Sequence, residues 1–126
     1  MVRAGLLLGM LLLSLPPGAL AASATAGEAG VRRVEALVGE ARFREAVREA
    51  AALRPGVLAL APSGQSRRLL VRTELAAGTA ALALGQEGTA RSCFLRALQI
   101  EPTLVLSASA PPKVRRVLDA LRKGGA

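Results

Sequence analysis

The apolar positions of this chain recur every three or four residues, which is the spacing of amphipathic helices. The first such stripe consists of Val31, Val34, Leu37, Val38 and Ala41. The second consists of Phe43, Ala46, Val47, Ala50 and Leu53. We expect the second helix to end at Arg54-Pro55-Gly56, because proline and glycine do not continue a helix well. No stretch of useful length alternates with the period of two that a half-buried strand shows, so the pattern predicts an all-α fold.

Three further helices are predicted after a connecting loop at residues 55–66, which is rich in proline, glycine and serine. The third covers about residues 67–84 and ends at Gly85, since glycine favours the backbone conformation of a helix C-cap. The fourth covers about residues 87–100. The last covers residues 112–123, because proline suits the first turn of a helix. Short connections make the first four helices two antiparallel pairs.

The first residues have the pattern of a secretory signal peptide. Arg3 gives a basic start, residues 4–15 form an apolar run of 12, and helix-breaking residues at 16–18 precede small side chains. That run is shorter than the ~20 residues that a membrane span needs, which disfavours an uncleaved anchor. We expect cleavage after Ala21, with Ala24 as the second choice, so that residues 1–21 are removed and the protein is periplasmic or secreted, with no transmembrane helix. No cysteine lies near the cleavage site, so a lipid-modified N-terminus is not expected.

Composition excludes several kinds of site. The chain has 126 residues and a formal net charge of +8, with one Cys, two Phe and no His, Trp or Tyr. Without His there is no imidazole base and no His-ligated zinc, and one Cys cannot form an internal disulfide. The scarcity of aromatic side chains removes the stacking surfaces of single-strand nucleic-acid binders. We therefore expect no catalytic residue, no metal or other cofactor, and no nucleic-acid partner.

Segment 71–104 carries small, aromatic and proline residues at the positions of a known helical repeat. These residues are Gly78, Ala90, Phe94, Ala97 and Pro102. The segment resembles the tetratricopeptide repeat, a helix-turn-helix unit of 34 residues. The small residues would let two helices approach closely, Phe94 would fill the space between repeats, and Pro102 would end the second helix. Glu74 departs from the family pattern, because a large apolar residue is usual at its position.

Segment 27–60 is a weaker match to the same unit, and it places the two pairs 44 residues apart (Ala46 to Ala90) instead of 34. Arg33 stands where an apolar residue is expected, and Leu53 replaces a small one. Residues 22–27 are expected to be a disordered lead-in to one helical domain at 28–126. Repeats of this kind usually need three or more copies for stability, so we expect helix 112–123 to cap the exposed face. Self-association, docking on a partner, and an unrelated Ala-rich bundle are the alternatives.

The resemblance also implies a concave groove that binds peptides or proteins, lined by the first helix of each unit. On segment 71–104 the groove-lining residues would be Arg72, Leu75, Thr79 and Leu82. An Arg beside small and apolar residues suits a carboxylate of a partner. The alternative is that Arg72 is a solvated surface charge and that the two leucines only pack.

The last helix combines an apolar stripe with a basic face. The basic residues are Lys113, Arg115, Arg116, Arg122 and Lys123. Such a helix is typical of membrane-surface binding, although basic residues near a helix C-terminus are also ordinary dipole complementation. Cys93 lies on one apolar stripe with Phe94 and is expected to be buried, the alternative being a disulfide between two chains.

These features favour a non-catalytic, exported protein–protein interaction module, an adaptor or scaffold in the cell envelope or periplasm. Its partner would be another protein or a protein assembly. The alternative is an envelope-surface protein that binds anionic lipid or polymer through its basic C-terminal helix. Groove binding should survive salt concentrations that screen attraction to a charged surface.

Overall fold

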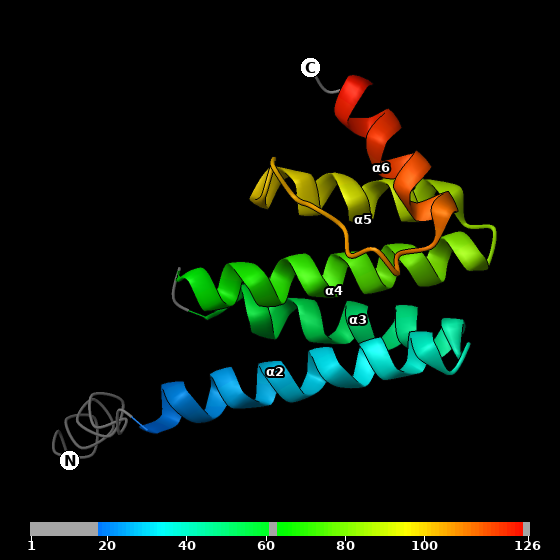
Figure 1. Cartoon of the computed structure of the whole chain (residues 1–126). Helices are drawn as coiled ribbons and strands as arrows, with labels where there is room; N and C mark the ends of the chain where they lie inside the picture. The colour runs from blue at the N-terminus through cyan, green and yellow to red at the C-terminus, as the bar shows by residue number, and fades with distance from the viewer. Residues whose placement is uncertain (1–17, 61–62, 125–126) are drawn as a thin grey trace, which may run out of the picture.

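The computed structural model describes residues 18–60 and 63–124, and within them every regular element is a helix. The helices are α2 (Gly18–Gly39), α3 (Phe43–Leu58), α4 (Gly64–Ala83), α5 (Glu87–Ile100) and α6 (Pro112–Gly124). Helices α2 to α5 follow one another across the molecule, each antiparallel to the next, and α6 crosses α5 near the C-terminus (Figure 1). The predicted all-α array of two helical hairpins with a C-terminal helix is confirmed.

Helix α4 is the centre of this array, because it packs against α2, α3 and α5. One part of the core lies between α4, α5 and α6 and surrounds the fully buried Phe94. A second part lies between the two hairpins, and its members are Val34, Leu37, Ala46, Ala50, Ala76, Ala77, Ala80 and Cys93. Most of these are alanines, so the two hairpins approach closely with few large side chains between them.

Helix α2 begins earlier than the apolar stripe predicted. It begins at Gly18 and includes residues 22–27, so the expected disordered lead-in is wrong. This segment is rich in Ala, the residue with the highest helix propensity, and Gly27 is buried where a Cβ would lie 3.4 Å from Leu69 Cδ1. Residues 1–17 of the expected signal peptide lie outside the described residues, and the expected cleavage site after Ala21 falls within α2.

Helix α3 continues through Pro55 to Leu58, so the expected end at Arg54 is also wrong. Proline lacks an N–H and costs the helix one hydrogen bond, but the carbonyl of Pro55 still accepts the Ala59 N–H at 3.0 Å. The extra turn buries Val57 against Val31 and Leu69. Burial of this side chain offsets the lost bond, and the expected loop at residues 55–66 is correspondingly shorter.

Helix α4 begins at Gly64 because Ser63 and Ser66 form a reciprocal cap, each side chain accepting the other's backbone N–H. Gly85 follows α4 with a φ of +76°, as its expected role in the C-cap requires. The bounds of α5 match the prediction, and α6 extends one residue beyond it. None of the helices in the described ranges is both long and apolar enough to cross a membrane.

Candidate functional site

A hollow of about 370 Å³ lies between α2, α4 and the segment that connects α5 to α6. Arg72, Leu75 and Thr79 line it from α4, and Glu35 and Val38 line it from α2. Three of the four residues predicted to line a groove therefore surround one hollow. We call this hollow the groove.

The connecting segment 101–111, here called the strap, forms the opposite wall of the groove. It passes across α4 and α5 before α6 begins (Figure 1). Buried Leu104 holds the strap to the core, and the guanidinium of Arg115 donates to the carbonyl of Ser107. Val105 is 86% exposed and lines the groove. The sequence analysis assigned no element to the strap, although its apolar run 104–106 is a signal that it contacts the core.

Arg72 lies in the groove but is already paired within the chain. Its Nη1 donates to Glu28 at 2.9 and 3.0 Å, and its Nη2 donates to Glu35 at 2.6 Å. The hydrogen bond from Arg72 lowers the pKa of the Glu28 carboxyl, and the two glutamates raise the pKa of Arg72. The predicted role of Arg72 as a ligand for a partner's carboxylate is therefore not supported by this geometry. Instead it fastens α4 to α2 and keeps that wall of the groove in place.

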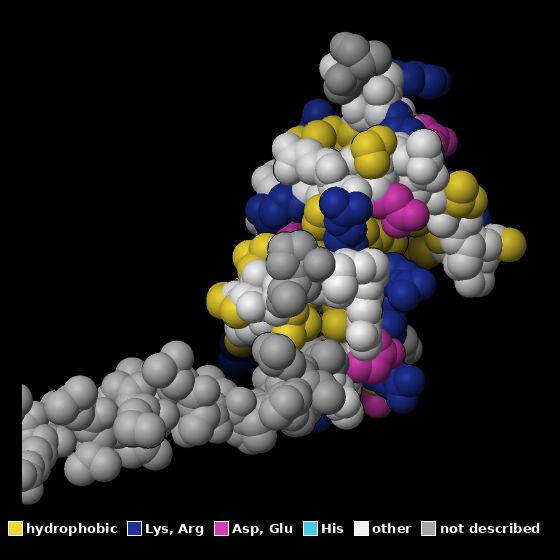
Figure 2. Space-filling view, turned by 90° about the vertical axis from the view of Figure 1, so that its left-hand side faces the viewer, with side chains coloured by type: hydrophobic (Ala, Val, Ile, Leu, Met, Phe, Trp, Pro, Cys, Tyr) yellow, Lys and Arg dark blue, Asp and Glu magenta, His cyan; other side chains and the backbone are white. Residues whose placement is uncertain are grey.

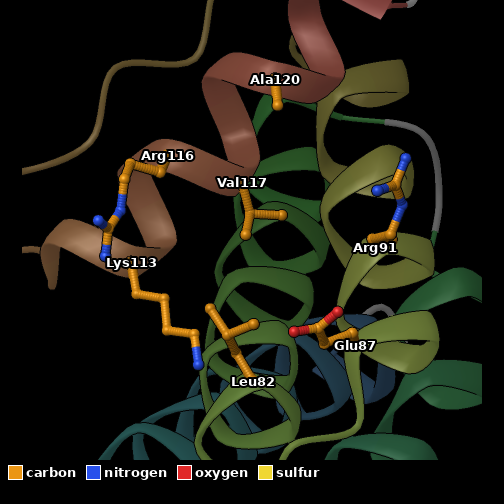
Figure 3. Close-up of a pocket in the computed structure, with 7 residues that line it drawn as sticks. All are labelled: Leu82, Glu87, Arg91, Lys113, Arg116, Val117 and Ala120. Atoms are coloured by element: carbon orange, nitrogen blue, oxygen red, sulfur yellow. The ribbon is translucent and has the colours of Figure 1, made fainter.

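Leu82, the fourth predicted groove residue, lies elsewhere. It is buried and packs in the part of the core around Phe94. It also forms the floor of a separate hollow between α4, α5 and α6 (Figure 3). Side chains of α5 and α6, and none of the strap, line that hollow with it.

The close helix approach predicted from the repeat-like residues is present in the second hairpin. A Cβ on Gly78 would lie 2.6 Å from Phe94 Cε1, so only glycine fits under the ring. Ala90, Phe94 and Ala97 are fully buried, and Pro102 follows Glu101, the C-cap residue of α5. These residues therefore set the spacing between α4 and α5.

The first hairpin achieves close contact with a different pair. Leu53, which replaces a small residue of the repeat pattern, would meet a Cβ on Gly30 at 2.7 Å. In the second hairpin, 44 positions later, Ala97 is equivalent to Leu53 and Glu74 is equivalent to Gly30. The first hairpin therefore has the small residue on its first helix and the large one on its second, and the second hairpin has the reverse at these two positions.

Glu74 carries a buried carboxylate that sequence reasoning noted only as a departure from the repeat pattern. The residue is 1% exposed, and its Oε1 accepts from Arg54 Nη2 at 2.6 Å. Its Oε2 accepts from Arg96 Nε at 2.5 Å. These two arginines come from α3 and α5, so the cluster joins both hairpins through α4. Arginines donate hydrogen bonds to both oxygens of this carboxylate, so its role is structural.

Cys93 is buried beside this cluster, as predicted. Burial, together with the negative charge of Glu74, raises the pKa of its thiol. Arg96 Nη2 lies 3.6 Å from Cys93 Sγ. Within residues 18–60 and 63–124, no three side chains of the usual metal-binding types converge on a common point.

The basic residues of α6 divide into two groups. Lys113, Arg116, Arg122 and Lys123 are exposed, whereas Arg115 is half-buried against the strap. The apolar side of α6 is used in packing, because Val114, Leu118 and Leu121 are buried in the core. Figure 2 shows Lys and Arg side chains spread over one face of the molecule, with fewer acidic ones among them.

No protein-family model, curated protein or solved structure matches this chain. The groove, the hollow beside α6 and the exposed cations are therefore the features from which a function is inferred.

Proposed function

We propose that this protein is a non-catalytic scaffold that binds another protein in the groove between α2, α4 and the strap. The observation that carries the proposal is that Arg72, Leu75 and Thr79 line one hollow with the strap. The resemblance of segment 71–104 to the tetratricopeptide repeat supports the same use of the first helix of each pair.

The groove has fixed walls and an apolar interior with polar edges. Arg72 holds α4 to α2 through two carboxylates, and Phe94 over Gly78 holds α5 to α4. Half-buried Leu75 and exposed Val105 offer apolar contact. A preformed surface of this kind loses little conformational freedom when a partner binds. The occupant we propose is a protein segment that inserts an aliphatic side chain beside Leu75.

We also propose that the protein acts outside the cytoplasm, in the periplasm or cell envelope. The support is the basic, apolar and small-residue pattern of residues 1–24. Mass spectrometry of the protein from its native cells should show a chain that begins at Ala22. A cytoplasmic chain that keeps residues 1–21 would contradict this location.

The groove is tested by site-specific photo-crosslinking in native cells. A photoreactive residue placed at Thr79 should give a discrete adduct with a partner protein. The same residue at Ser92, which is exposed on α5, is the matched control and should give none. Equal adducts from both positions, or none from Thr79, would refute binding in the groove.

Binding of anionic lipid or polymer by α6 is the competing proposal, and the exposed Lys113, Arg116 and Lys123 favour it. Insertion into a bilayer is disfavoured, since the apolar side of α6 faces the core. Only surface attraction is left, and salt screens that attraction. Flotation with phosphatidylglycerol vesicles at low salt, lost at high salt, would support this competing function.

A further inference from the structure

A second hollow, of about 210 Å³, lies where α6 crosses α4 and α5. Leu82, Val117 and Ala120 form its apolar part. Figure 3 shows Lys113 and Arg116 on one side of Val117, and Arg91 and Glu87 on the other. We call this the α6 hollow; it shares no lining residue with the groove.

The charges around the α6 hollow are not balanced by the chain itself. Within residues 18–60 and 63–124, Arg91, Lys113 and Arg116 have no ion pair or hydrogen bond through their side chains. Two other cations of α6 do have partners within the chain. Arg115 donates to the Ser107 carbonyl, and Arg122 Nη1 lies 3.8 Å from Asp119 Oδ1.

This imbalance is part of a wider asymmetry along the chain. From residue 75 onward there are seven Lys and Arg but only three acidic residues. Among the described residues, the ion pairs that join different helices all lie between α2, α3, α4 and α5, whereas α6 docks through apolar side chains. The cations at the α6 hollow are therefore available to an outside anion.

The shape of the α6 hollow indicates what kind of anion fits. Its volume is below the roughly 300–1,000 Å³ of small-molecule sites, but it offers apolar surface for a single aliphatic side chain. Leu82 in that surface is only 4% exposed, so contact with it requires a side chain that inserts between the helices. A protein segment with an aliphatic side chain between carboxylates matches both the floor and the rim.

We propose that the α6 hollow docks an acidic segment of a partner protein. An aliphatic side chain of that segment contacts Leu82 and Val117. Carboxylates on one side of it pair with Lys113 and Arg116, and a carboxylate on the other side pairs with Arg91. The negative charge of Glu87 repels a carboxylate placed next to it. The carboxylates of the segment therefore lie closer to Arg91 and Arg116 than to Glu87.

The first test measures binding of end-blocked peptides to the full chain. The probe is Glu-Glu-Leu-Glu-Glu, and the comparison peptide has Gly in place of Leu. We expect the Leu peptide to bind at least about fivefold more tightly, because burying a Leu side chain is favourable. The amide NMR signals of Leu82, Val117 and Ala120 should shift with the Leu peptide. Equal affinity of the two peptides would overturn the proposal.

The second test compares two charge-reversed variants. Lys113→Glu combined with Arg116→Glu should weaken binding of the Leu peptide about tenfold or more. Arg44→Glu combined with Lys123→Glu is the matched control, since it reverses two exposed cations without ion pairs outside the α6 hollow. The control should change affinity by less than about twofold at moderate salt. Equal losses in both variants would mean diffuse attraction and would overturn the proposal.

A third variant keeps the charge and fills the hollow. Ala120 is exposed at its edge, so Ala120→Trp should fold, and circular dichroism checks this. It should abolish the preference for Leu over Gly. Phosphatidylglycerol vesicles that bind wild type but not the Lys113/Arg116 variant, with no Leu preference among peptides, would assign the site to lipid instead. Crosslinking from Thr79 reports on the groove separately, so failure here is distinguishable from failure of the proposed function.

Discussion

At the scale of single residues, the spacing of α4 and α5 depends on Gly78. A methyl group there would lie 2.6 Å from Cε1 of the fully buried Phe94, so the ring or the helix must shift. Gly78→Ala should therefore lower the free energy of unfolding by about 1–3 kcal/mol, as overpacking does. Urea denaturation followed by circular dichroism measures this change.

Gly88 in α5 is the matched control, because a Cβ there meets nothing within 4 Å. Gly88→Ala should leave stability unchanged or raise it by up to about 1 kcal/mol, since Ala favours the helix. If both substitutions had the same sign and size, the close approach at Gly78 would not determine helix spacing.

Glu74 is the second residue on which packing depends. Glu74→Ala leaves Arg54 and Arg96 without their shared carboxylate and should cost about 3 kcal/mol, the low end for a buried ion pair because both arginines keep some exposure. Replacing all three by Leu should recover most of that loss, because an apolar cluster can substitute for a buried ionic one. A triple variant less stable than Glu74→Ala would show that the ion pairs are needed beyond charge compensation.

Glu28 gives stability a dependence on pH. Its pKa is lowered in the folded protein by the hydrogen bond from Arg72, so the folded state binds fewer protons than the unfolded chain in acid. The contribution is complete above the unfolded pKa of about 4.5 and is lost as pH falls through the lower folded pKa.

Glu28→Gln should therefore be less stable at neutral pH and should lose less stability between about pH 5 and 3 than wild type. Urea unfolding at several pH values measures both effects. Glu101→Gln is the control, since Glu101 is exposed and its side chain has no ion pair among the described residues. The same pH slope in wild type and Glu28→Gln would be inconsistent with the pairing to Arg72.

At the scale of elements, apolar periodicity and end signals predicted α5 and α6 almost to the residue. Local chemistry determines where both helices begin. Gly85 adopts the positive φ of the turn before α5, and a proline occupies the first position of α6. The prediction failed at the start of α2 and the end of α3. There, burial of Gly27 and Val57 against Leu69 extends the helices, and such tertiary contacts leave no local pattern.

Helix α6 was expected to cap the second hairpin, and Leu118 carries its packing. This side chain is 1% exposed and belongs to the part of the core around Phe94. Leu118→Ala should cost about 2–5 kcal/mol. Leu95→Ala, at a side chain that is 41% exposed, should cost about 1 kcal/mol or less. Equal stability of the two variants by thermal or urea unfolding would show that α6 does not cap the hairpin.

At the scale of the whole molecule, the sequence predicted some residues of the groove but not the ion pairs of Arg72 or the wall that the strap forms. Leu75 and Thr79 fall one helical turn apart, so their common face follows from periodicity. The pairing of Arg72 with Glu28 and Glu35 does not, because it depends on how α2 lies against α4. The wall that the strap forms and the arrangement of cations around the α6 hollow likewise depend on how α6 packs against α4 and α5.

The central claim is that the molecule binds a protein in the groove between α2, α4 and the strap. The most direct measurement is capture from the native envelope with C-terminally tagged wild type and Thr79→Arg, each washed at low and high salt. We predict a defined protein that stays on wild type at high salt and is absent from Thr79→Arg, because a large charged side chain fills the groove. The same protein retained equally by both, or only lipid or polymer that is shed as salt rises, would contradict the account.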